Sequence, residues 1–323
     1  MSADILLWVL QLVAGVAAIV WGAEQFAEHL STAAARLGVG AFALALLLAG
    51  AEPEELATVV VASLRNAPGI AFGDIIGANV TMCLVALGLG AVLVPLHFTT
   101  RVLRYALAAV PISAISLVLA WDGELSRLEG AALVALYVAY VAAIWLFERK
   151  PPALGEVEEL IEAEEEAGSH PARRGRVGVE LLLVLLAVVA MAAGGTALVE
   201  AIRRITNIED TQTKLGLTVV GFATGFELVV LVWSAARRDA MDVALAGVVG
   251  SFGYNMTMSI GAGALVRPLH LGDPANLRAP AVIMLAVLAA IIVLAMPTRR
   301  LGRPAGSALL CGYPLFVLFV VLR

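Results

Sequence analysis

The sequence contains little charge and few cysteines. Lysine, arginine, aspartate and glutamate make up 15% of the 323 residues, whereas apolar residues make up 61%. So much apolar surface excludes a soluble globular protein. The formal net charge of −5, without a basic stripe, excludes a nucleic-acid-binding protein. The two cysteines, Cys83 and Cys311, lie in apolar stretches, which excludes a secreted disulfide scaffold. We expect them to be packing residues, neither a redox pair nor a metal clip.

Long stretches with almost no charge recur along the chain. A helix of about 18 or more such residues spans the ~30 Å hydrocarbon core of a bilayer. The hydropathy therefore predicts an all-α membrane protein with ten transmembrane helices. The predicted spans are 5–28, 40–63, 69–94, 102–120, 128–147, 178–201, 215–235, 243–266, 279–296 and 305–322.

One long polar segment, residues 148–176, divides these spans five and five. Its run of glutamates resembles a calcium-sensing segment, but such a charge run is more typical of a solvated linker. We therefore expect five-helix units at 1–147 and 177–323. Ten alternating spans place 13 of the 21 lysines and arginines on the side of the linker. Because positive loops stay in the cytoplasm, this predicts a cytoplasmic linker and an outward N-terminus.

The two halves of the chain are similar to each other at a constant offset of 173 residues, without a gap. Five spans, an odd number, separate equivalent positions, so the second copy must enter the membrane from the opposite side. The sequence therefore predicts two inverted five-helix repeats, as in secondary transporters with a substrate site at the bilayer midplane. The matched residues include Gly22 and Gly195, Glu54 and Glu227, Arg65 and Arg238, Gly77 and Gly250, and Pro95–His97 and Pro268–His270.

Acidic stretches interrupt the second and seventh spans at corresponding places, 50–55 and 223–227. Acidic side chains within the hydrocarbon core are energetically costly, so their presence indicates a functional site. Glycine-rich segments follow at 73–79 and 247–252. In these elements the sequence resembles the cation/calcium exchanger superfamily, in particular the prokaryotic sodium/calcium exchanger membrane domain. Its two repeats carry a Gly-Thr-Ser-x-Pro-Glu element and a Gly-Asn-x-x-Gly-Ser-Asn element. The resemblance covers nearly the whole chain.

The resemblance implies a secondary antiporter that exchanges Ca2+ for Na+ or H+ by alternating access, with spans one and six sliding against the rest. The conserved glutamates of the family match Glu54 and Glu227. Its second-repeat serine matches Ser251, and the acid or amide one turn later matches Asn255. The first repeat diverges, because the family's hydroxyl and amide positions there are occupied by Gly50, Ala51, Ala78 and Met82.

Cation chemistry is consistent with these positions. Pro53 lacks an N–H group and should break the second span, which frees the carbonyl of Gly50 as a hard oxygen ligand. Ca2+ takes ~6–8 oxygens, which two glutamates, backbone carbonyls and water can supply. We therefore expect Glu54 and Glu227 to hold the metal ion. The complete candidate cation-binding set is Glu54, Glu227, Thr224, Ser251, Asn255, Gly50 and Ala223.

Three further acids, Glu52, Glu55 and Asp74, lie near this set in the sequence. In a regular helix Glu52 and Glu55 are i, i+3 neighbours and point roughly away from Glu54, and we expect at least one of them to line an aqueous approach to the site. Asp74 either supplements the reduced ligand set of the first repeat or pairs with a helix dipole. We expect these acids to relay protons or ions.

Two other classes compete with an antiporter. Paired acids also suit an intramembrane acid-dependent enzyme, although the sequence has no His-Glu-x-x-His or Gly-x-Ser-x-Gly element. A channel would need a filter element that the sequence lacks. A transport-inactive homologue is a further alternative, because first-repeat ligands are missing. We expect no cofactor, the lipid bilayer and small inorganic cations as partners, no nucleic acid, and a place in the bacterial inner (plasma) membrane. The sequence leaves the oligomeric state open.

Overall fold

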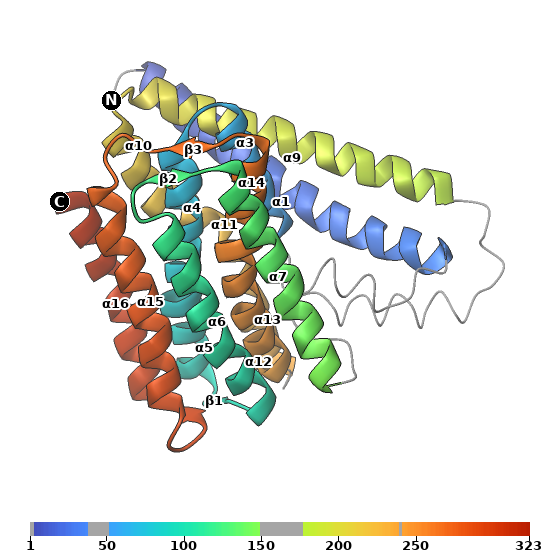
Figure 1. The fold of residues 1–323 in the computed structure, drawn as a ribbon, viewed down its shortest axis with the longest axis vertical. Helices are drawn as coiled ribbons and strands as arrows, with labels where there is room; N and C mark the ends of the chain where they lie inside the picture. The colour runs from blue at the N-terminus through green and yellow to red at the C-terminus, as the bar shows by residue number, and fades with distance from the viewer. Residues whose placement is uncertain (1–2, 38–51, 149–176, 239–240) are drawn as a thin grey trace.

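The computed structural model describes residues 3–37, 52–148, 177–238 and 241–323, and the described chain is almost entirely helical (Figure 1). The first half contains α1 (Ala3–Leu37), α3 (Pro53–Leu64), α4 (Pro68–Thr81), the π-helix η1 (Met82–Ala86), α5 (Leu87–Leu93), β1 (Leu96–His97), α6 (Thr100–Leu119), β2 (Glu124–Leu125) and α7 (Arg127–Glu148). The second half contains α9 (Val177–Ile205), α10 (Glu209–Leu215), the π-helix η3 (Gly216–Val220), α11 (Gly221–Thr224), α12 (Phe226–Arg238), α13 (Met241–Tyr254), the π-helix η4 (Asn255–Ser259), α14 (Ile260–Val266), β3 (Leu269–His270), α15 (Ala275–Ala295), β4 (Arg300–Leu301) and α16 (Arg303–Leu322).

Eight helical segments of the described chain are long and apolar enough to cross a membrane. This confirms the prediction of an all-α membrane protein. The predicted span 40–63 lies partly outside the described residues, and the predicted span 243–266 corresponds to the uninterrupted helix α13–η4–α14. The eight segments are Asp4–Ala34, Pro68–Leu93, Thr100–Leu119, Arg127–Ile144, Val177–Ile205, Glu209–Arg237, Ala275–Ala295 and Arg303–Leu322.

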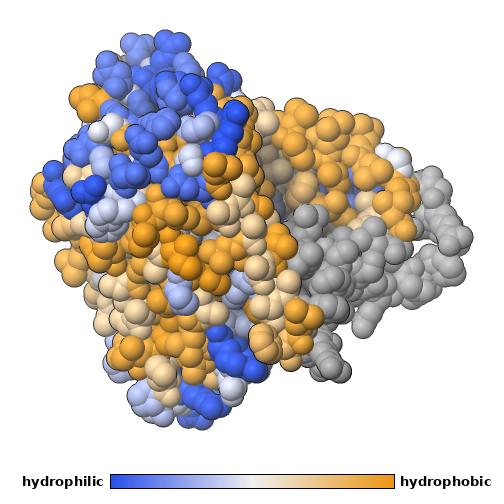
Figure 2. Space-filling view, viewed as in Figure 1, coloured by the Kyte–Doolittle hydropathy of each residue, from blue (hydrophilic) through white to orange (hydrophobic). Residues whose placement is uncertain are grey.

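The surface is divided into an apolar band between two polar ends (Figure 2). Both termini lie toward one end, and α7 runs toward the other (Figure 1). Two short antiparallel ladders each join the two halves of the chain, β1 with β4 and β2 with β3. The long helices α1 and α9 pack along each other and extend sideways from the bundle.

Several elements of the second half lie 173 positions after a counterpart in the first half. The π-helix η1 corresponds to η4, α5 to α14, and β1 to β3, each with the same bounds after the shift. This is the offset that the sequence comparison of the two halves predicted. A π-helix is rare and occurs mostly at functional sites, so its presence at the same place in both halves points to the centre of the bundle.

A tight crossing in this centre joins α4 to the continuous α10–η3 helix through glycines. A Cβ atom added at Gly73 would lie 2.8 Å from the carbonyl oxygen of Thr213 and 2.9 Å from the Cα atom of Gly216. From the other side, a Cβ atom at Gly216 would lie 3.1 Å from the carbonyl oxygen of Gly69. Small residues let two membrane helices approach until their backbones touch. The crossing brings α4, from the first half, against the helix of the second half that carries Thr224.

We predict that Gly73→Ala destabilises the protein by about 1–3 kcal/mol, because the new methyl group meets backbone atoms that cannot rotate away. Gly178→Ala, in α9, is the matched control, since a Cβ atom there has nothing within 4 Å. Thermal unfolding in detergent should show a lower midpoint for Gly73→Ala and no loss for Gly178→Ala. Equal midpoints for both variants would contradict this account of the crossing.

Candidate functional site

The site begins where α3 begins. Pro53 is the first residue of this helix and Glu52 is its N-cap residue. Proline suits the first position because its missing N–H would have no partner there and because its ring blocks continuation from the preceding turn. The predicted break at Pro53 therefore corresponds to a helix start. Gly50 and Ala51, with the carbonyl ligand predicted at Gly50, lie outside the described residues.

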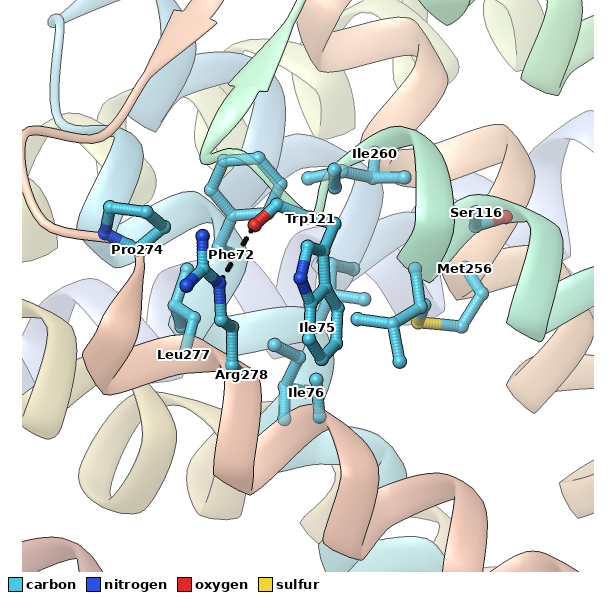
Figure 3. Close-up of a pocket in the computed structure, with 13 residues that line it drawn as sticks. Phe72, Ile75, Ile76, Ser116, Trp121, Met256, Ile260, Pro274, Leu277 and Arg278 are labelled. Atoms are coloured by element: carbon cyan, nitrogen blue, oxygen red, sulfur yellow. Dashed lines mark hydrogen bonds between the residues drawn. The ribbon is translucent and has the colours of Figure 1, made fainter.

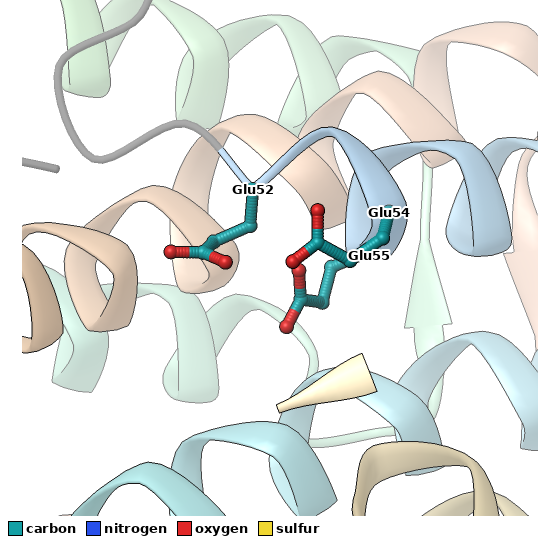
Figure 4. Close-up of side chains that lie close together, drawn as sticks. All are labelled: Glu52, Glu54 and Glu55. Carbon is teal, nitrogen blue, oxygen red and sulfur yellow. The ribbon is translucent and has the colours of Figure 1, made fainter. Parts of the chain in front are cut away.

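Three glutamates converge at the start of α3. Glu52, Glu54 and Glu55 are 5%, 1% and 0% exposed. One carboxylate oxygen from each lies within 4.8 Å of the other two, a grouping able to hold a metal ion (Figure 4). We call these three residues the glutamate cluster.

The expectation that Glu52 and Glu55 point away from Glu54 is therefore wrong. Glu52 precedes the helix, with φ −117° and ψ 89°, so helical spacing does not govern its direction. Glu54 and Glu55 lie in the first turn. Side chains in a helix lean toward its N-terminus and normally pack over the preceding turn. Residues in the first turn have no preceding turn, so their side chains extend beyond the start of the helix. Both carboxylates therefore reach into the space before the helix.

Most oxygens around this cluster lack a hydrogen-bond partner. Within the described part of the chain, no donor reaches either carboxylate oxygen of Glu54 or of Glu55, and the same holds for Oγ1 of Thr58 and Oδ2 of Asp74. All four residues are buried. A buried carboxylate without a donor is costly as an anion, so each needs a proton or a cation. The arrangement is a set of hard oxygen atoms suited to a cation such as Ca2+.

The second half contributes a matching break. Gly225 separates α11 from α12, at a place where glycine weakens the helix. Glu227 lies in the first turn of α12, is partly buried, and is close enough to interact electrostatically with all three members of the glutamate cluster. Thr224, the last residue of α11, donates its hydroxyl to Oδ1 of Asp74 at 2.9 Å. The two helix breaks therefore meet across the two halves.

The α13–η4 helix supplies two further predicted residues. The Ser251 hydroxyl donates to Oε1 of Glu52 and also lies 3.1 Å from the carbonyl oxygen of Gly247. Asn255, at the start of η4, donates from Nδ2 to Oδ1 of Asn79 at 3.4 Å. Ser251 thus joins the glutamate cluster directly, whereas Asn255 belongs to an amide pair between α4 and η4.

The sequence reasoning missed Asn79 and Thr58. Both are fully buried, on α4 and α3 respectively, and Asn79 accepts the hydrogen bond from Asn255. Their signal in the sequence was a polar side chain within a predicted membrane span. Ala223 is partly buried, and a ligand role for its carbonyl oxygen stays a prediction.

The fold and the site together define a polytopic membrane transporter with interior carboxylates at paired helix breaks. The sequence pattern of the family described as "Sodium/calcium exchanger protein" matches residues 7–146 and 179–322. The chain belongs to the sodium/calcium exchanger protein family, and its members are transporters, not enzymes.

Relatives and solved structures agree with this assignment. The chain is 27% identical to the sodium/calcium exchanger MaX1 of Methanosarcina acetivorans, over 96% of this chain and 98% of the relative. It is 23% identical to the inner membrane protein YrbG of Escherichia coli K12, over 94% and 93%. Its fold is similar to that of the sodium-calcium exchanger NCX_Mj, with a TM-score of 0.58, 20% identity, and coverage of 97% of this chain and 99% of the other.

Proposed function

We propose that the protein exchanges Ca2+, or a similar divalent cation, for H+ or Na+ across a lipid bilayer by alternating access. The observation that carries this proposal is the glutamate cluster, whose buried carboxylates lie opposite Glu227 with most of their oxygens unpaired. Family membership supports cation antiport as the overall reaction. The ions are substrates, and no cofactor is required.

Glu54 and Glu227 are the central ligands in this proposal. Each lies in the first turn of a helix that starts at a break, α3 or α12, and they come from opposite halves of the chain. Their carboxylates, the Thr224 and Ser251 hydroxyls, the Asn255 amide, carbonyl oxygens at Gly50 and Ala223, and water supply the ~6–8 oxygens that Ca2+ requires.

Glu52, Glu55 and Asp74 act as proton or ion relays in this scheme. Glu52 and Glu55 lie beside Glu54, and Asp74 is close enough to Glu55 to interact electrostatically with it. None of the three acids has a lysine or arginine partner among the described residues, so each needs a proton when the central site holds no cation. Glu52 accepts a hydrogen bond from Ser251, and Asp74 accepts one from Thr224. Both acids of the first half are therefore bonded to hydroxyl groups of the second half.

The proposed architecture is ten spans in two inverted repeats, with a cytoplasmic acidic linker, an outward N-terminus and a location in the bacterial inner membrane. The family pattern matches two separate segments of similar length, which supports two copies. The equal offset of η1 and η4, and ladders that join the halves at both ends, support the same arrangement. The two termini at one polar end agree with an even number of spans.

Alternating access is proposed to involve sliding of α1 and α9 against the bundle. A Cβ atom at Gly22 would meet Met191 and Ala187 of α9, whereas one at Gly195 would lie 3.1 Å from Cβ of Val61 on α3. Gly22 therefore lies inside the α1–α9 pair, and Gly195 lies between that pair and the bundle. This packing supports a sliding surface at Gly195, with α1 and α9 moving together.

Radioactive Ca2+ efflux from preloaded proteoliposomes tests this function. For an antiporter, we expect efflux to require an external counter-cation and to saturate with its concentration. Efflux into medium without any counter-cation would indicate a channel. No efflux under any cation gradient, from protein that still binds Ca2+, would indicate a transport-inactive homologue.

A further inference from the structure

A pocket lies outside the carboxylate site, beside the β2–β3 ladder and between α4, α6, η4 and α15 (Figure 3). Its position follows from Trp121 and Pro274, which lie at the two connections next to this ladder. Apolar side chains form most of the wall. They include Phe72, Ile75, Ile76, Met256, Ile260 and Leu277.

Ser116 and Arg278 of the lining differ in the hydrogen bonds that they can offer a ligand. The Ser116 hydroxyl donates to the carbonyl oxygen of Ile112 at 3.2 Å, so its proton is already used. Arg278 donates from Nε to the carbonyl oxygen of Trp121 at 3.0 Å, and its Cζ atom lies 5.4 Å from the centroid of the Trp121 ring. Within the described chain, no carboxylate pairs with Arg278. The pocket therefore combines an apolar interior with one uncompensated positive charge.

We propose that this pocket holds part of an acyl chain of an anionic phospholipid, whose phosphate accepts hydrogen bonds from the free guanidinium N–H groups of Arg278. Charge complementarity selects an anion, and the apolar wall selects a hydrocarbon chain. Arg278 lies near the start of α15 and Trp121 just after α6, so both lie at the ends of candidate membrane spans. Trp and Arg at this depth are typical contacts for lipid headgroups.

The bilayer places such a ligand next to the pocket. The helices α6 and α15 are both candidate membrane spans, and each exposes large apolar side chains, including Ile115 and Val282. The opposite wall is formed by α4 and η4, the elements that carry Asp74 and Asn255 next to the pocket residues Ile75 and Met256. A bound chain would therefore fill space behind two helices of the candidate cation site. This lipid site does not rest on the proposed transport function.

Native mass spectrometry of the full-length protein, extracted in mild detergent and titrated with phosphatidylglycerol or phosphatidylcholine, tests the site. The unmodified protein should retain phosphatidylglycerol preferentially. Arg278→Gln should lower the retained phosphatidylglycerol at least about tenfold, the loss expected when a charge-assisted contact of ~1.5 kcal/mol or more is removed. Arg278→Lys should retain most of the binding. Arg104→Gln, an exposed arginine in the first turns of α6, is the matched control and should bind as the unmodified protein does.

The position of the chain is tested separately by fluorescence. Phosphatidylglycerol with brominated acyl chains should quench the unmodified protein more than Trp121→Phe, because the Trp121 ring lines the pocket. Equal quenching of the two proteins, equal retention of the two lipids, or retention unchanged by Arg278→Gln would overturn the proposal. Displacement of phosphatidylglycerol by inorganic phosphate would assign the pocket to a free phosphate instead.

Discussion

Glu54→Gln is expected to abolish Ca2+ binding while leaving the protein folded. Glu54 is 1% exposed, lies in the middle of the glutamate cluster and has no hydrogen-bond donor on either oxygen among the described residues. The amide removes one negative charge and one ligand oxygen from a buried cation, a loss of about 3 kcal/mol or more, which corresponds to at least ~100-fold in affinity. Glu227→Gln should have the same effect from the other half of the chain.

Isothermal titration calorimetry with Ca2+ measures this loss, and the unfolding midpoint shows that the variants stay folded. Glu24→Gln, at an exposed position of α1, is a control that removes the same charge far from the cluster. It should bind Ca2+ normally. An unchanged Ca2+ affinity in Glu54→Gln or in Glu227→Gln would remove the cation site from this location.

The helix breaks and the repeat relation between the two halves could be predicted from the sequence. Proline at 53 forbids a regular helix through that point, and glycine at 225 weakens one, so both breaks follow from backbone chemistry. The offset of 173 residues, which first emerged from matched glycines and glutamates, also relates η1 to η4 in the structure. Such local and repeated features need no knowledge of tertiary contacts.

The direction of the extra acids could not be predicted, because it depends on where the helix starts. Spacing rules placed Glu52 and Glu55 away from Glu54, but these rules hold only inside a helix, and α3 starts after Glu52. The hydrogen bond between Asp74 and Thr224 depends on the close crossing of α4 with η3. That crossing is a tertiary contact between residues about 150 positions apart, which hydropathy and periodicity do not contain.

The last expected result concerns the counter-ion: a pH gradient should drive Ca2+ uptake, and a Na+ gradient should not. Clustered carboxylates in a water-poor interior repel one another, so protons can replace Ca2+ on the same oxygens. A Na+ site needs additional neutral oxygen ligands. The first half has Ala78 and Met82 where the family has a hydroxyl and an amide, and both residues are fully buried beside the site. The protein therefore has the groups for proton exchange and fewer groups for Na+.

Ca2+ uptake into proteoliposomes distinguishes proton coupling from Na+ coupling, because each gradient can be imposed without the other. A pH gradient of one unit supplies about 1.4 kcal/mol per proton, so Ca2+ should accumulate about tenfold for each proton exchanged. An outward Na+ gradient at clamped pH should give little uptake. Thr224, Ser251 and Asn255 retain oxygens that can hold one Na+, although each already bonds to a neighbour across the site.

Met82→Asn, which restores an amide at the start of η1, should increase Na+-driven Ca2+ uptake if the number of hydroxyl and amide oxygens limits Na+ binding. Strong Na+-driven uptake by the unmodified protein, with none from the pH gradient, would contradict proton coupling and establish Na+/Ca2+ exchange.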